Sequence, residues 1–289
     1  MNVFILCAGE GRRLQPYTLK NPKPAIPFMS VPLAYYSLAL IDHLKFKNLV
    51  VNTFHLPEQV SILFNNSIFK GAKSVNVSNE SFLLGSAGGI NQAYQYLKND
   101  DHFMMMNGDE VILPKNFGVI DRLIQEHIAY KPIATILTAE HQEVGGKFGG
   151  IWTDGNSQVE EISKKEPSPG LKGEHFLGVM ILDKRIKDFL SNEIVEENIF
   201  YPILNNAIKA GEKVRTYKIE TEWFETGNTD DFLKASETCA SVILNKSSDY
   251  WVEHLKQVIS YYGGVDGLVE KDHPLLNDLV TKAVKTIRG

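Results

Sequence analysis

The regular alternation of short apolar segments with segments of helical periodicity limits the possible folds more than any other feature of the sequence. Residues 2–7, 48–53, 102–107 and 133–138 are short apolar runs, as in strands that are buried on both faces. Further predicted elements are helices at 33–44, 57–64, 87–97 and 117–127 and a brief strand at 75–77. Strand, helix and strand in succession build parallel sheets with crossover helices. We therefore predict an α/β fold with a mixed, mostly parallel central sheet flanked by helices.

The pattern changes twice in the second half of the chain. From about residue 145, strands are predicted at 151–153, 159–162, 176–182 and 214–219, and a single helix at 199–210. This pattern indicates a β-rich insertion or a second layer on the same sheet. After residue 231 only helical patterns follow, and a helix-start signal stands at Asp272, His273 and Pro274. We predict a main domain over residues 1–236 and a small helical C-terminal appendage over residues 237–289.

Composition and the first residues narrow the function classes. The 289 residues carry 30 lysines and arginines against 35 aspartates and glutamates, a net charge of −5, so we expect no nucleic-acid partner. Two cysteines without a zinc-type spacing indicate a reducing compartment. The glycines and arginines directly after residues 2–7 do not fit a signal peptide, and no apolar run is long enough to span a membrane. We expect a cytoplasmic protein with no membrane partner.

The strongest chemical signal is the segment ILCAGEGRRLQPYTLKNPKPAIP at residues 5–27. Glycines directly after a strand let backbone N–H groups approach an anion. Arg12, Arg13, Lys20 and Lys23 supply positive charge beside them. The segment lacks the third glycine of the dinucleotide fingerprint, and it is not a phosphate loop of the GxxxxGK[ST] type. The glycine pattern alone therefore leaves both an anion-binding loop and an ordinary tight turn open.

The whole segment resembles the signature of the sugar-1-phosphate nucleotidyltransferases, roughly LAAGxGxRLxPxTxxxPKPxxP, with a cysteine in place of the first alanine. The resemblance implies a Rossmann-like fold of the nucleotide-diphospho-sugar transferase type. It also implies that the loop of Ala8, Gly9 and Gly11 holds a nucleoside triphosphate. Arg13 would grip the phosphates of this nucleotide, and Lys23 would lie between the phosphates of both substrates.

A second segment follows in the order of that family. Residues 84–90, LGSAGGI, match its LGTAGG segment, which closes over the base and ribose. By this resemblance the backbone of Gly85 would read the base edge. Glu80 stands where the family often has an acidic residue near the base, but members with different nucleotides share it. A helix-opening turn would also explain the glycines of residues 84–90.

Two acidic residues are candidate metal ligands. Asp109 ends an NGD triplet after the predicted strand 102–107, where α/β sheets place ligands. By resemblance Asp109 is the first ligand of Mg²⁺, an ion that prefers one or two carboxylates together with phosphate oxygens. A turn or helix-cap aspartate is the alternative. The segment WFETGNT at residues 223–229 resembles the W-x-D-x-G-T motif, in which Glu225 replaces the second ligand. The glutamate keeps a hard oxygen donor, but it could also mark a weakened site.

The sugar-phosphate site is matched less closely. Gly149 and Gly178 correspond to two family glycines beside the sugar. The family's EKP triplet places its glutamate on sugar hydroxyls and its lysine on the sugar phosphate. In this chain the best register puts Lys164 on that glutamate and Lys165 on that lysine. Lys165 would then meet phosphate, and a lysine stands where the family has its hydroxyl-binding glutamate. A surface charge cluster would explain the same residues.

The resemblance implies a reaction in which a sugar 1-phosphate attacks the α-phosphate of a nucleoside triphosphate, assisted by Mg²⁺, and yields a nucleotide-sugar and pyrophosphate. Residues 51–60 look most like mannose-1-phosphate guanylyltransferases and N-acetylmuramate-1-phosphate uridylyltransferases, so we expect a role in cell-envelope polysaccharide synthesis. Two alternatives stay open. One is a phosphocholine cytidylyltransferase of the same fold, with Trp152, Tyr201 and Trp223 as a cage for the quaternary ammonium. The other is a non-catalytic regulatory subunit. The C-terminal helices could form a homo-oligomer or cover the active site.

Overall fold

The computed structural model describes residues 1–65 and 69–289. Half of the central sheet is parallel, in the order β5-β4-β1-β6. These strands are β1 (Asn2–Leu6), β4 (Phe46–Thr53), β5 (Ala72–Asn79) and β6 (His102–Asn107). β5 extends beyond the predicted residues 75–77. As an edge strand it carries polar side chains, which a search for apolar runs overlooks.

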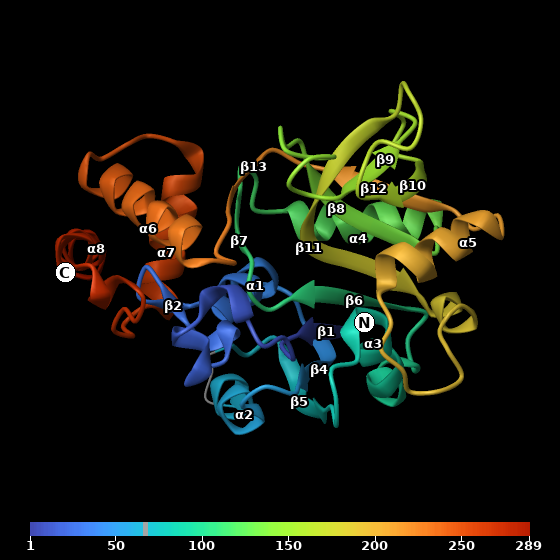
Figure 1. The fold of residues 1–289 in the computed structure, drawn as a ribbon, viewed down its shortest axis with the longest axis horizontal. Helices are drawn as coiled ribbons and strands as arrows, with labels where there is room; N and C mark the ends of the chain where they lie inside the picture. The colour runs from blue at the N-terminus through green and yellow to red at the C-terminus, as the bar shows by residue number, and fades with distance from the viewer. Residues whose placement is uncertain (66–68) are drawn as a thin grey trace.

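The second half of the sheet is built around β11 (Lys172–Asp183), which runs antiparallel between β6 and β8 (Ala134–Ala139). β12 (Val214–Lys218) pairs in parallel with β8. β9 (Gly150–Thr153) pairs with the first residues of β11, and β10 (Val159–Ser163) pairs with β9. The β-rich segment therefore continues the central sheet instead of forming a second layer (Figure 1).

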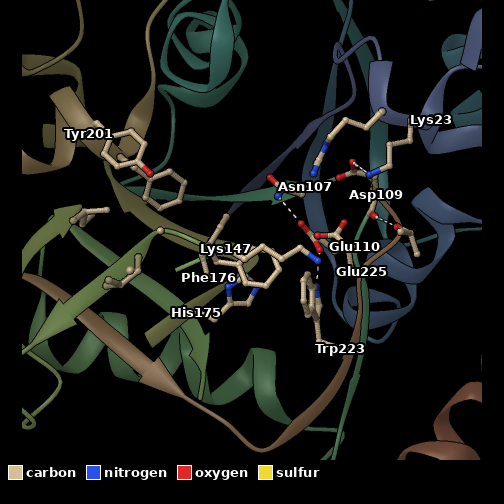
Figure 2. A pocket seen from close by; sticks show the side chains of 18 residues that line it. Lys23, Asn107, Asp109, Glu110, Lys147, His175, Phe176, Tyr201, Trp223 and Glu225 are labelled. Atoms are coloured by element: carbon tan, nitrogen blue, oxygen red, sulfur yellow. Dashed lines mark hydrogen bonds and ion pairs between the residues drawn. The ribbon is translucent and has the colours of Figure 1, made fainter. Parts of the chain in front are cut away.

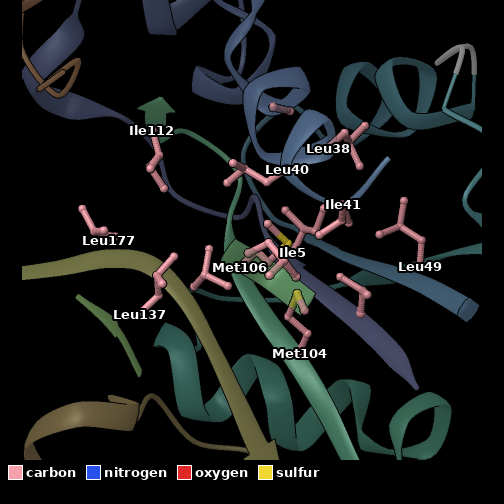
Figure 3. Packing of buried hydrophobic residues seen from close by; sticks show 14 of the residues in the cluster. Ile5, Leu38, Leu40, Ile41, Leu49, Met104, Met106, Ile112, Leu137 and Leu177 are labelled. Atoms are coloured by element: carbon pink, nitrogen blue, oxygen red, sulfur yellow. The ribbon is translucent and has the colours of Figure 1, made fainter. Parts of the chain in front are cut away.

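Helices cover both faces of this sheet. α1 (Leu33–Ile41), α2 (Pro57–Asn65) and α4 (Val119–Tyr130) share one hydrophobic cluster with Ile5 of β1 and with Met104 and Met106 of β6 (Figure 3). α3 (Gly85–Leu97) packs on the other face against Phe4 and Met105. Neighbouring residues of a strand point to opposite faces. The apolar runs at residues 2–7 and 102–107 are therefore buried from both sides, as predicted.

Two elements differ from the local pattern. β7 (Val111–Pro114) and β13 (Thr221–Phe224) form a small antiparallel sheet that was not predicted. Its strands are short and come from distant parts of the chain, so no local periodicity marks the pairing. The helix expected at 199–210 is a π-helix (Ile199–Leu204) followed by α5 (Asn205–Lys209). Pro202 lies inside the π-helix, where it cannot donate a backbone hydrogen bond.

The C-terminal helices are α6 (Thr229–Leu244), α7 (Tyr250–Tyr262) and α8 (Pro274–Arg288), and they lie together beside β7 (Figure 1). Their apolar residues share a hydrophobic cluster with β2 (Pro27–Phe28), β3 (Val31–Pro32) and the start of α1. The proposed boundary after residue 236 falls inside α6. The division into two domains stays a prediction, but the helices have one shared core with the N-terminal segment.

Polar contacts join the C-terminal region to the loop that carries the glycines and arginines. The phenol of Tyr17 donates a hydrogen bond to Asp272 Oδ2 over 2.7 Å. The Ser30 hydroxyl donates to the Val265 carbonyl over 2.7 Å, and the Gly264 amide donates to the Ser30 carbonyl over 3.1 Å. The C-terminal region therefore braces residues 12–32. No helix in the described part of the chain is both long and apolar enough to cross a membrane.

Candidate active site

The loop after β1 is shaped by a glycine that no other residue could replace without strain. Gly11 has φ +62°, and a Cβ built there would lie 2.8 Å from Thr18 Cγ2. The Thr18 hydroxyl donates to the Gly11 carbonyl over 3.0 Å and closes the loop. At the surface, Arg12 Nε forms an ion pair with Glu10 Oε2 over 2.6 Å. Its neighbour Arg13 lines the cavities on the inner side of the loop.

Lys23 and Asp109 come together at the carboxyl end of the parallel strands. Lys23 Nζ lies 2.7 Å from Asp109 Oδ2, although 86 residues separate them in the sequence. Burial by itself lowers the pKa of Lys23, but the carboxylates of Asp109, Glu110 and Glu225 outweigh this effect and raise it. Lys23 is therefore a fixed cation in the working pH range, surrounded by three carboxylates.

Two cavities meet at this pair. The smaller one, about 280 Å³, is enclosed by the loop after β1 and is lined by Gly9 and Gly11. The larger one, about 450 Å³, opens toward β9, β11 and β13. Both are lined by Arg13, Lys23 and Asp109. Two cations and one carboxylate thus stand where the contents of the two cavities would meet. Figure 2 shows Lys23 and Asp109 at the larger cavity.

The larger cavity holds two further carboxylates. Glu225, a predicted metal ligand, lines it and accepts a hydrogen bond from the Gly227 amide over 2.6 Å. Glu110 was not predicted as a site residue, because the NGD triplet ends at Asp109 and Glu110 lies outside it. The Glu110 carboxylate accepts from Asn107 Nδ2 over 3.0 Å and from Trp223 Nε1 over 2.8 Å. Figure 2 shows these acidic side chains on one side of the cavity and Tyr201 on the other.

The residues expected at the sugar phosphate divide into two groups. Gly149 lines the larger cavity, and a Cβ built there would lie 2.8 Å from the Tyr201 hydroxyl. Lys165 is exposed and does not line it, and neither does Gly178. Lys147, which was not predicted, lines the cavity instead and pairs with Asp231 over 3.1 Å. Lys147 directly precedes the matched residues Phe148 and Gly149, and nothing in the local pattern distinguished it.

The residues expected at the nucleotide base do not line either cavity. Glu80 is buried, and its carboxylate accepts from Asn52 Nδ2 over 2.6 Å and from the Leu84 amide over 3.0 Å. Burial raises the pKa of Glu80, and the two hydrogen bonds oppose this rise. Gly85 is exposed at φ +66°, and a Cβ there would lie 2.6 Å from the Glu197 carbonyl. The close packing at the start of α3 is thus a structural reason for a glycine at position 85. Its contact with a nucleotide base stays a prediction.

The aromatic residues considered as a cage are only partly assembled. Tyr201 and Trp223 line the larger cavity, whereas Trp152 is buried and donates its indole N–H to the Ser163 carbonyl over 3.2 Å. His175 lies against Trp223 with ring centroids 4.5 Å apart. Burial, together with nearby His141, lowers the pKa of His175 to about 4, so it is neutral near pH 7.

Whether the larger cavity could hold a metal ion depends on the oxygen ligands that its side chains offer. Among residues 1–65 and 69–289, no group of three or more histidine, cysteine, aspartate and glutamate side chains could hold a metal ion. Asp109 and Glu225 line the same cavity and offer carboxylate oxygens. Mg²⁺ usually retains several waters and takes one or two carboxylates in addition to substrate phosphates. This donor set therefore fits an ion that arrives with a phosphorylated substrate.

The fold and the paired cavities define an α/β protein with two cations, Arg13 and Lys23, where α/β sheets place ligands, at the carboxyl ends of the parallel strands. The family model for nucleotidyl transferases matches residues 2–242. The chain therefore belongs to the nucleotidyl transferase family.

Several known proteins resemble the chain. It is 26% identical to a UTP–glucose-1-phosphate uridylyltransferase of Synechocystis, over 81% of this chain and 62% of the relative. It is 28% identical to a mannose-1-phosphate guanyltransferase of Yarrowia lipolytica, over 83% of this chain and 63% of the relative. The chain thus spans about three fifths of these curated relatives. A solved structure of a putative glucose-1-phosphate thymidylyltransferase from Bacillus anthracis has the same fold, with a TM-score of 0.67 and 21% identity over 81% of this chain and 93% of that one.

Proposed function

We propose that this chain transfers a nucleotidyl group from a nucleoside triphosphate to a sugar 1-phosphate and releases pyrophosphate. The observation that carries the proposal is the meeting of two cavities at Arg13, Lys23 and Asp109. The smaller cavity, beneath the loop after β1, takes the triphosphate, and the larger one takes the sugar 1-phosphate. Family membership and the named relatives support this reaction.

The reaction needs no protein nucleophile. A phosphate oxygen of the sugar 1-phosphate attacks the α-phosphorus in line, the bond from that phosphorus to the bridging oxygen breaks, and pyrophosphate leaves on the opposite side. Two anionic substrates repel each other, so the protein contributes positioning and charge compensation. Arg13 neutralises the departing phosphates, and Lys23 stands between the two substrates. Lys147 also lines the larger cavity, and we propose that it binds the sugar phosphate in place of Lys165.

Mg²⁺ is part of the proposal. Asp109 and Glu225 would hold the ion, and when bound it supplies charge neutralisation to the phosphates. Glu225 would do so while it accepts the Gly227 amide hydrogen bond. Removal of the metal with a chelator should abolish turnover, and Mg²⁺ should restore it.

The setting of the reaction is also proposed. Both cysteines, Cys7 and Cys239, are buried and free, which fits the reducing cytoplasm that we propose as the compartment. A nucleotide-sugar made there would serve the cell envelope. Association of two copies through α7 and α8 remains a proposal, to be measured by light scattering.

The proposal is tested by pyrophosphate release from a panel of nucleoside triphosphates with hexose 1-phosphates, N-acetylhexosamine 1-phosphates and phosphocholine. We expect release with one sugar 1-phosphate and a preference for one base. Release with phosphocholine alone would favour the cytidylyltransferase alternative. Nucleotide binding without release from any pair would favour the regulatory subunit.

A further inference from the structure

Glu110 lines the larger cavity, and two hydrogen bonds hold its carboxylate in place. The reaction proposed above gives this side chain no role. Each of its oxygens has one N–H donor, from Asn107 at 3.0 Å and from Trp223 at 2.8 Å. These two donors come from β6 and β13, so two separate elements fix the orientation of one side chain (Figure 2). A carboxylate oxygen can accept more than one hydrogen bond. Glu110 therefore keeps acceptor capacity toward the cavity that it lines.

The backbone makes room for this side chain. β11 carries an irregularity in its pairing with β8 between Phe176 and Met180. Gly178, inside it, has φ +73°, and a Cβ built there would lie 2.5 Å from Glu110 Cγ. Any other residue at position 178 would be strained and would also displace Glu110. Gly178 was expected beside the sugar, and in the structure it lies directly against the Glu110 side chain.

The residue that the resemblance aligns with the sugar-hydroxyl contact is not part of this cavity. Lys164, aligned with the glutamate expected on the sugar hydroxyls, is exposed and does not line the cavity. The cavity combines polar side chains with aromatic ones, among them Phe148 and Trp223 with ring centroids 5.5 Å apart. Ligand sites are typically apolar surfaces on which a few placed polar groups fix orientation and specificity. Glu110 has the position and the support of such a group.

We propose that Glu110 accepts hydrogen bonds from hydroxyl groups of the sugar and thereby determines which sugar 1-phosphate is used. The inference rests on the proposed function, since it names a specificity residue for the same cavity. Asn107 and Trp223 fix the orientation of the carboxylate, and a hydroxyl group of a bound sugar would donate to the acceptor capacity that these two hydrogen bonds leave free.

The substitution Glu110→Gln separates this role from a purely structural or electrostatic one. The new carboxamide can still accept from Trp223 through its oxygen. The Asn107 amide can turn so that its own oxygen accepts the added N–H group. Removal of a negative charge near Lys23 should strengthen the binding of anionic phosphates. A purely electrostatic role therefore predicts improved use of both substrates, whereas a hydroxyl contact predicts a loss confined to the sugar 1-phosphate.

The experiment compares wild type, Glu110→Gln and a control, Glu222→Gln. Glu222 lies on β13 beside Trp223, and burial raises the pKa of its carboxyl, but it does not line the larger cavity. Pyrophosphate release is measured with the accepted sugar 1-phosphate and its monodeoxy analogues. For Glu110→Gln we expect kcat/KM of the sugar 1-phosphate to fall roughly ten- to a hundredfold. The KM of the triphosphate should not rise. The penalty for one deoxy analogue should shrink toward unity, and the control should behave like wild type.

Each outcome decides one of the two claims. An unchanged or improved kcat/KM in Glu110→Gln, with turnover by wild type intact, overturns the role of Glu110 and leaves the proposed function standing. If wild type releases no pyrophosphate from any pair, the proposed function fails. Calorimetric titration with the same sugar 1-phosphates then decides the remaining question. Weaker binding by Glu110→Gln supports the contact, and equal or absent binding by both proteins overturns it.

Discussion

Lys23 interacts with the carboxylates of Asp109, Glu110 and Glu225, whereas Asp109 forms its ion pair with Lys23. We therefore expect variants of the two residues to differ in the free energy of unfolding. Lys23 Nζ lies 2.7 Å from Asp109 Oδ2, and their side chains are 13% and 31% exposed. The perturbation is a double-mutant cycle with Lys23→Met and Asp109→Asn, which remove the two charges and preserve most of the side-chain volume.

The magnitude follows from this partial burial. Breaking a buried ion pair from one side costs about 3–5 kcal/mol, and an exposed pair contributes about 0.2–1 kcal/mol. Lys23→Met leaves Asp109, Glu110 and Glu225 without their shared cation, so we expect the free energy of unfolding to fall by about 2–3 kcal/mol. Asp109→Asn leaves Lys23 beside two carboxylates, and we expect about 1 kcal/mol. The double variant should be more stable than Lys23→Met, because we expect a coupling of about 2 kcal/mol, larger than the cost of Asp109→Asn alone.

Urea unfolding gives the stabilities, and pyrophosphate release gives the activities. Removal of one group that stabilises transition-state charge commonly costs on the order of 10²–10³ in rate. Both single variants and the double variant should therefore lose most turnover, although the double variant regains stability. If Lys23→Met is no less stable than Asp109→Asn, the reasoning from three carboxylates is wrong. Turnover by Lys23→Met at the wild-type rate would remove Lys23 from the mechanism.

Three further predictions test other parts of the structure. His127 is buried with Nδ1 2.9 Å from Thr135 Oγ1, and burial, with nearby His102, lowers its pKa to about 4. Since an unfolded histidine titrates near 6.5, protonation favours the unfolded chain below that pH. Wild type should lose about 2 kcal/mol more unfolding free energy between pH 7 and pH 5 than His127→Gln, and equal losses in urea titrations would contradict this. Gly85→Ala places a Cβ 2.6 Å from the Glu197 carbonyl at φ +66° and should lower the unfolding free energy by about 1–3 kcal/mol. Gly146→Ala, whose Cβ would meet only the Glu143 carbonyl at 3.5 Å, is the control and should change little. Burial and the Asp272 hydrogen bond raise the pKa of Tyr17 to about 12; Asp272→Asn should shift it back toward 10 in a tyrosinate absorbance titration, with Tyr17→Phe identifying the signal.

Much of the fold could be predicted because its signals are local. Strands buried on both faces appear as continuous apolar runs, and the helices between them repeat apolar residues at a fixed spacing. The loop after β1 is equally local, since Gly11, Arg13 and Lys23 lie within one short segment. Asp109 could be found because the end of a buried parallel strand is where α/β folds place ligands. These inferences depend on neighbours in sequence, which the chain displays directly.

The remaining parts of the site depend on contacts between distant segments. Lys147 lines the larger cavity and Lys165 does not, because the course of the chain between β8 and β11 decides which lysine turns inward. The sequence by itself determined the parallel half of the sheet, the glycine-rich loop after β1 and the family signature. Only the tertiary structure decided that Glu110 is held by Trp223, 113 residues later, and that Gly178 makes room for it. The physical reason is that hydrogen bonds and steric room are set by distances in space, which a sequence pattern does not contain.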